Sequence, residues 1–235
     1  MKHIIKMKNK IEFVAFDADD TLWVNETHFY EFETKFCTLI EKYLPCSQAS
    51  KKLFETEMKN LHLYGYGAKG MMLCMIELIC KVADTRGSLS CISEVIRLGQ
   101  ELLQKPVNLL EGVEEVLLKL SKKYKLLLVT KGDLLDQERK IELSGLNEYF
   151  HHIEIMSNKR RSDYLRLIKQ QGGKPDNFLM LGNSLKSDII PVLELGAYAI
   201  HIPYHTTWKH EQCNLSIEHP NFIKLDHITE VLNYL

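Results

Sequence analysis

Five short runs rich in Val, Ile, Leu and Phe constrain the fold of this chain more than any other feature. They lie at residues 12–16, 125–129, 152–156, 178–181 and 197–202. Most of them are followed by a segment whose apolar residues recur at helical spacing. Near-continuous apolar strands that alternate with amphipathic helices are typical of βαβ units. The sequence therefore predicts an α/β fold, with helices on both faces of a parallel sheet.

One long segment interrupts this alternation. About a hundred residues separate the first two apolar runs, far more than a strand-to-helix connection needs. Four stretches inside it have apolar residues at helical spacing, at residues 26–43, 48–61, 69–83 and 90–104. We therefore expect a helical domain over residues 24–105, inserted beside the mouth of a core formed by residues 1–23 and 106–235.

Composition and charge indicate which partners the protein can bind and where in the cell it is found. The chain has 235 residues, 45% of them hydrophobic, and 30 Lys+Arg against 31 Asp+Glu give a net charge of -1. Nucleic acids and anionic membranes usually require a basic excess, so we expect neither as a partner. The six cysteines form no CxxC pair, and the basic start lacks the apolar region of a signal peptide. These features predict a cytoplasmic protein.

Polar and charged residues follow the predicted strands. Ligands bind beyond the carboxyl ends of the strands in open α/β sheets, so these residues should meet at one crevice. They are two aspartates after the first strand, a threonine and a lysine after the second, a lysine after the third, and an asparagine and an aspartate after the fourth. In chain order they are Asp17, Asp19, Thr130, Lys131, Lys159, Asn183 and Asp188.

The two aspartates after the first strand suit phosphoryl transfer. Asp17 would attack phosphorus, and Asp19 would protonate the leaving oxygen and then deprotonate the hydrolytic water. Because a carboxylate and a phosphate repel each other, a lysine and Mg²⁺ would be needed to offset their charge. Asp17, the backbone carbonyl of Asp19, and oxygens from Asn183 and Asp188 suit that hard cation.

In order and context these segments resemble the four motifs of the haloacid dehalogenase-like (HAD) hydrolase superfamily. The sequence DADDT, from Asp17, resembles the first motif, DxDx[TV], and Thr130 the second. Lys159 resembles the third motif, and GNSLKSD, ending at Asp188, resembles the fourth, GDxxxxD. The inserted helices take the position of the family's C1 cap. The resemblance implies a Rossmann-like core and a Mg²⁺-dependent phosphatase acting on a small phosphorylated metabolite.

The resemblance also implies a role for each matching residue. Asp17 would be the nucleophile, and Asp19 the general acid and base. Thr130 would hydrogen-bond the transferring phosphoryl group, and Lys159 would neutralise its charge and orient Asp17. Lys131, next to Thr130, is a further candidate for binding the substrate.

Asn183 departs from the family pattern, which more often has an aspartate there as a metal ligand. A neutral amide contributes less charge, so we expect weaker metal affinity, with Asp188 holding the metal directly or through water. A phosphomutase would share Asp17 and Asp19 with a phosphatase. The weakened metal site also leaves open a binding or regulatory protein with little turnover.

Overall fold

The computed structural model describes residues 10–213 and 215–235, without the side chains of residues 85 and 86. The described chain divides into two compact units. The first contains the described residues up to Glu26, Val107–Lys131 and the described part of Glu138–Leu235. The second contains Thr27–Pro106 and the short segment Gly132–Gln137. No described helix is both long enough and apolar enough to cross a membrane.

The first unit is built on a six-stranded sheet with the order β3-β2-β1-β4-β5-β6, in which every neighbouring pair is parallel. Five of these strands fall on the five predicted apolar runs, and the α/β fold is confirmed. The three-residue strand at the sheet edge was not predicted. The strands are β1 (Phe13–Phe16), β2 (Lys125–Lys131), β3 (His152–Met156), β4 (Phe178–Gly182), β5 (Tyr198–His201) and β6 (Phe222–Lys224).

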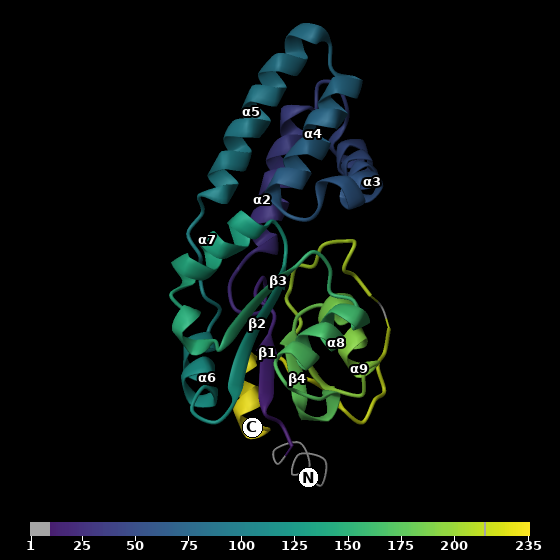
Figure 1. Cartoon of the computed structure of the whole chain (residues 1–235). Helices are drawn as coiled ribbons and strands as arrows, with labels where there is room; N and C mark the ends of the chain where they lie inside the picture. The colour runs from purple at the N-terminus through teal and green to yellow at the C-terminus, as the bar shows by residue number, and fades with distance from the viewer. Residues whose placement is uncertain (1–9, 214) are drawn as a thin grey trace. The chain divides into compact units, whose positions relative to one another are not determined.

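Helices cover both faces of this sheet (Figure 1). Successive side chains of a strand point to opposite faces. Val14 and Phe16 of β1 accordingly pack in one buried cluster with residues of α6, whereas Phe13 and Ala15 pack in another with residues of α8 and α9. Both faces are buried, which explains why the strand sequences are apolar throughout. The helices are α6 (Val113–Leu120), α7 (Leu134–Ser144), α8 (Arg161–Gln170) and α9 (Ile190–Leu193).

Short helical turns complete the connections of the first unit. The turn most relevant to function is η3 (Leu185–Ile189), which lies between β4 and α9 and carries Asp188. The others are η1 (Asn147–Tyr149), η2 (Pro175–Asn177) and η4 (Ile228–Asn233).

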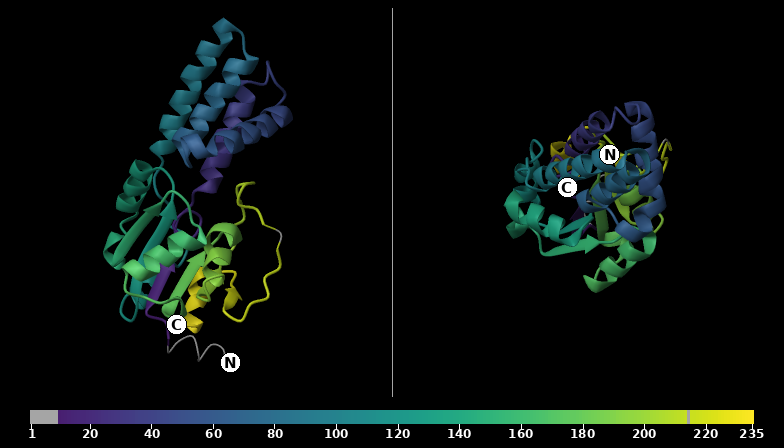
Figure 2. Two further views of the ribbon diagram at one scale, coloured as in Figure 1. Left: turned by 45° about the vertical axis from the view of Figure 1, so that its right-hand side comes forward. Right: turned by 90° about the horizontal axis from the view of Figure 1, so that it is seen from above.

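The second unit is a group of helices with its own apolar core. It consists mainly of α2 (Glu26–Leu39), α3 (Cys46–Tyr64), α4 (Ala68–Val82) and α5 (Thr85–Leu103). Helix α4 contacts both α3 and α5, and Figure 2 shows α4 and α5 running alongside each other. Phe36, Leu53 and Met75 are fully buried between them. The segment Gly132–Gln137 also belongs here, where the ammonium of Lys69 binds Asp133 at 2.7 Å.

Candidate active site

The carboxyl ends of the central strands place the polar residues at one edge of the sheet. Strand β1 pairs with β2 on one side and with β4 on the other, with Phe16 opposite Leu128 and Leu181. Asp17 follows directly, and its backbone N–H donates to the carbonyl of Leu181 at 2.9 Å. The ends of β2 and β4 therefore lie on either side of Asp17.

The chain turns sharply after β1, which separates the two aspartates of the DADDT segment. Asp20 has a φ of 62°, and its N–H donates to the carbonyl of Trp23 at 2.7 Å. The carboxylate of Asp20 accepts the backbone N–H groups of Asn25 and Glu26 at the start of α2. Asp20 is thus a structural residue that fixes the turn and caps the helix.

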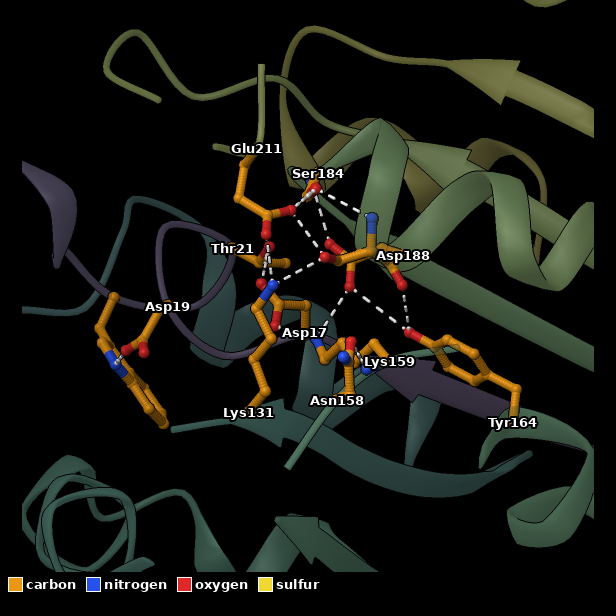
Figure 3. Close-up of polar contacts among 12 residues, drawn as sticks. Asp17, Asp19, Thr21, Lys131, Asn158, Lys159, Tyr164, Ser184, Asp188 and Glu211 are labelled. Carbon is orange, nitrogen blue, oxygen red and sulfur yellow. Dashed lines mark hydrogen bonds and ion pairs between the residues drawn. The ribbon is translucent and has the colours of Figure 1, made fainter. Parts of the chain in front are cut away.

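A buried ion network surrounds Asp17 (Figure 3). The Lys159 ammonium donates to Oδ1 of Asp17, and it also donates to Oδ1 of Asp188 at 2.8 Å. The Thr21 hydroxyl donates to the other oxygen of Asp17 at 3.0 Å. The side chains of Lys159 and Asp188 are only 2% and 1% exposed. The structure therefore brings together Asp17, Lys159 and Asp188, three of the predicted site residues.

The charges of this network are not fully balanced. Burial raises the pKa of Asp17 to about 7, and the nearby Asp188 carboxylate adds to this effect, although Lys159 opposes it. Burial disfavours the Lys159 ammonium, but the two aspartates outweigh burial and raise the Lys159 pKa above its ordinary value. One ammonium thus serves two buried carboxylates, and an excess negative charge remains when both are ionised.

Both carboxylate oxygens of Asp188 accept hydrogen bonds in this network. Its Oδ2 accepts the backbone N–H of Ser184 at 3.0 Å, and its Oδ1 accepts from the Lys159 ammonium at 2.8 Å. A Cβ atom at Gly182 would lie 2.3 Å from Oδ2 of Asp188, so this close approach requires glycine. Gly182, the last residue of β4, therefore leaves the space that the Asp188 side chain occupies.

Asp19 lies apart from the Asp17 cluster in Figure 3. Its carboxylate accepts a hydrogen bond from the indole Nε1 of Trp23 at 2.7 Å, and Lys140 donates to both carboxylate oxygens at 2.6 and 2.8 Å. The Lys140 ammonium also reaches the Asn25 side chain at 3.1 Å. Trp23 and Lys140 therefore fix the orientation of Asp19, and sequence reasoning missed both.

Thr130 and Lys131 lie at the end of β2, as predicted. Thr130 is buried, and its backbone lies opposite Ile155 of β3. The Lys131 ammonium donates to the Ser187 hydroxyl at 2.8 Å and forms an ion pair with Glu211, a residue that the sequence did not single out. Glu211 lies in a segment whose apolar residues do not recur at helix or strand spacing, so no periodic pattern pointed to it.

The remaining predicted metal ligand is Asn183, which follows β4. Its backbone carbonyl oxygen forms a hydrogen bond with Nε2 of His201 at 2.9 Å. Residues 10–213 and 215–235 contain no group of three His, Cys, Asp or Glu side chains that could hold a metal ion. A divalent cation would therefore depend on Asp17, Asp188, backbone and amide oxygens, and water. This oxygen set fits Mg²⁺, which usually retains several waters, and the excess negative charge at Asp17 favours a cation.

Lys159 provides a direct test of the buried ion network. We expect Lys159→Met to lower the free energy of unfolding by about 3–5 kcal/mol, because it leaves two buried carboxylates without their cation. The loss should be smaller at about pH 5 than at about pH 8, since protonation of a carboxylate with a raised pKa stabilises the folded state. Denaturant unfolding at both pH values measures this difference.

The matched control is the double variant Lys159→Met/Asp188→Asn, which removes one of the two carboxylates together with the lysine. It should recover part of the lost free energy of unfolding. Equal stability of Lys159→Met and the wild type would show that the ion network is not important for folding.

Known proteins resemble this chain in both sequence and fold. A family model described as haloacid dehalogenase-like hydrolase matches residues 11–196. A haloacid dehalogenase-like family hydrolase from Xanthomonas campestris is 35% identical, with a TM-score of 0.82, over 94% of this chain and 88% of that one. A search of curated proteins gives no match.

More distant solved structures share the fold at 16% identity and a TM-score of 0.62. One is a predicted phosphoglycolate phosphatase from Haemophilus somnus, and another is a 2-haloacid dehalogenase from Pseudomonas syringae pv. tomato. Each match covers 95% of this chain and 97% of the other. The family match over most of the sequence and the close structural relative agree with the geometry of the strand ends. The chain belongs to the haloacid dehalogenase-like hydrolase family.

Proposed function

We propose that this hydrolase is a Mg²⁺-dependent phosphatase that cleaves a small phosphomonoester through an aspartyl-phosphate on Asp17. The carboxylate of Asp17, held between the Lys159 ammonium and the Thr21 hydroxyl, is the observation that carries the proposal. These two contacts fix the direction of the carboxylate, as an attacking nucleophile requires. Lys159 would also offset the negative charge of an incoming phosphate.

Asp19 favours a phosphatase over a dehalogenase. An alkoxide leaving group is strongly basic and needs a proton, whereas a halide leaves without one. Asp19 would supply that proton and later remove one from the hydrolytic water. The Lys140 ammonium and the Trp23 indole hold its carboxylate in one orientation. These contacts fix the position from which Asp19 would carry out both proton transfers.

The groups around Asp17 would bind the metal ion and hold Lys159 in place. Asp17 and Asp188, with the backbone carbonyl of Asp19 and the Asn183 amide, would hold Mg²⁺, which neutralises phosphate charge when bound. Asp188 also holds Lys159 in place.

On the substrate side, Thr130 and Lys131 at the end of β2 would bind the phosphoryl oxygens. In the first step a carboxylate oxygen of Asp17 forms a bond to phosphorus while the bond between phosphorus and the leaving oxygen breaks. The leaving oxygen takes the proton of Asp19.

Hydrolysis of p-nitrophenyl phosphate tests the proposal. We expect Mg²⁺-dependent release of p-nitrophenolate that stops when the metal is removed with a chelator and returns when Mg²⁺ is added back. A panel of phosphorylated metabolites should then release inorganic phosphate in proportion to the substrate lost. Isomerised sugar phosphate would instead indicate a mutase. Release of halide from 2-haloacids without phosphatase activity would contradict the proposal.

A further inference from the structure

A long segment between β5 and β6 contributes an unexpected residue to the sheet edge. In its described part, residues 202–213 and 215–221 contain neither a helix nor a strand. Segments of this length without regular structure are uncommon in compact domains and are often functional. From this segment the Glu211 side chain extends toward Ser184 in Figure 3, and it pairs with Lys131.

Glu211 contacts three polar side chains at once. Its Oε1 accepts from the Lys131 ammonium, and its Oε2 accepts from the hydroxyls of Ser184 and Ser187 at 2.5 and 2.6 Å. The Lys131 ammonium also donates to the Ser187 hydroxyl at 2.8 Å. The carboxylate therefore connects the end of β2 with the turn that follows β4.

This network is adjacent to the Asp17 cluster. Ser184 belongs to both, because its hydroxyl donates to Glu211 while its backbone N–H donates to Asp188 at 3.0 Å. Ser187 immediately precedes Asp188 in η3. Lys131 immediately follows Thr130 in β2. The Glu211 carboxylate thus acts on a lysine at the same sheet edge as the proposed nucleophile.

The pair of Lys131 and Glu211 is well shielded from water. Their side chains are 15% and 11% exposed. Burial alone would raise the pKa of Glu211, but Lys131 and the two serines outweigh burial and lower it to about 2. Ion pairs at such low exposure are less screened than surface pairs. Glu211 is therefore ionised at neutral pH and binds the ammonium tightly.

We propose that Glu211 is a positioning residue, which holds the Lys131 ammonium at the sheet edge so that it binds the phosphate group of the substrate. The inference rests on the proposed phosphatase function and adds a residue far along the chain to its substrate site. A free lysine side chain has many rotamers, and ordering it upon binding costs entropy. Glu211 and Ser187 order the Lys131 side chain before the substrate arrives.

The test compares wild type with Glu211→Gln, using p-nitrophenyl phosphate as substrate and inorganic phosphate as inhibitor. We expect the KM and the inhibition constant of phosphate to rise by about tenfold, the order expected for one charge-assisted hydrogen bond. The kcat should change by less than about twofold, because Lys131 does not take part in proton transfer or nucleophilic attack. Glu211→Asp keeps the charge and should recover most of the affinity.

Two further comparisons separate positioning from a general structural role. Lys131→Met should weaken phosphate inhibition by itself, and Glu211→Gln should add no further loss in that background, because both act through the same ammonium. Glu218→Gln is the matched control, since it neutralises an exposed carboxylate of the same segment and should leave the inhibition constant unchanged.

Three results would overturn the role of Glu211. They are unchanged or tighter phosphate inhibition in Glu211→Gln, equal behaviour of the Asp and Gln variants, and additive losses in the double variant. The first would leave the phosphatase proposal intact if wild type still turns over substrate. Wild-type activity no higher than that of Asp17→Asn would instead refute the phosphatase proposal and this inference together.

Discussion

Asp17→Asn should lower the turnover of p-nitrophenyl phosphate by on the order of 10⁴-fold or more, to the level of the solution without enzyme. An amide oxygen is a far weaker nucleophile than a carboxylate and cannot form the acyl phosphate. The substitution keeps the size of the side chain and an oxygen that can accept from Thr21. Steady-state release of p-nitrophenolate with saturating Mg²⁺ measures the loss.

The fold of this variant should remain intact. Burial and Asp188 raise the pKa of Asp17, so its charged form is disfavoured in the folded protein. Replacing it with a neutral amide leaves Lys159 paired with Asp188 alone, which balances the charges. Thermal unfolding should therefore give a Tm equal to or above that of wild type. Equal turnover by the two proteins would refute the role of Asp17 as nucleophile.

Asp19→Asn should have the second largest effect, and its size should depend on the leaving group. General acid catalysis contributes about 10²–10⁴-fold, and most when the leaving oxygen is strongly basic. We therefore expect a greater loss with an alkyl phosphate than with p-nitrophenyl phosphate, whose leaving group is weakly basic. The ratio of kcat/KM for the two substrates, in wild type and variant, measures this dependence.

Lys140→Met is the companion variant for Asp19. It removes the ammonium that donates to both oxygens of the carboxylate but leaves the Trp23 hydrogen bond. Its loss of kcat/KM should be smaller than that of Asp19→Asn, because the acid itself remains. Equal losses of Asp19→Asn on alkyl and p-nitrophenyl esters would contradict a role for Asp19 in protonating the leaving group.

The main strands could be predicted because the sheet is buried on both faces. Residues of β1 that point to opposite faces, such as Val14 and Ala15, are both inaccessible to solvent, so the strand appears in the sequence as an unbroken apolar run. The edge strand β6 lacks this signal. It has only three residues, which include the exposed Lys224, and it pairs with one neighbour.

The positions of Asp17, Lys159 and Asp188 could be predicted because parallel strands end at the same edge. The groups that hold Asp19 and Lys131 in place could not. Lys140 lies within α7 and Glu211 in a segment without regular structure, and each meets its partner only through the tertiary fold. Hydrogen bonds between residues so distant in sequence leave no periodic pattern in a single chain.

Gly132–Gln137 illustrates the same limit in the second unit. It directly follows β2, yet it is grouped with the inserted helices, where Asp133 binds Lys69. Gly67 approaches closely as well, since a Cβ at that position would lie 3.6 Å from the backbone nitrogen of Asp133. These contacts join residues more than sixty positions apart, and neither helical spacing nor turn composition predicts them.

The phosphoryl-enzyme intermediate is the most direct test of the proposed mechanism. Wild-type protein would be mixed with p-nitrophenyl phosphate and Mg²⁺, quenched in acid within one turnover, digested, and examined by mass spectrometry. We predict one added phosphoryl group on the peptide that contains Asp17, lost on treatment with hydroxylamine and absent from Asp17→Asn. Turnover without any phosphorylated Asp17 peptide, or with the phosphoryl group on another residue, would contradict the mechanism.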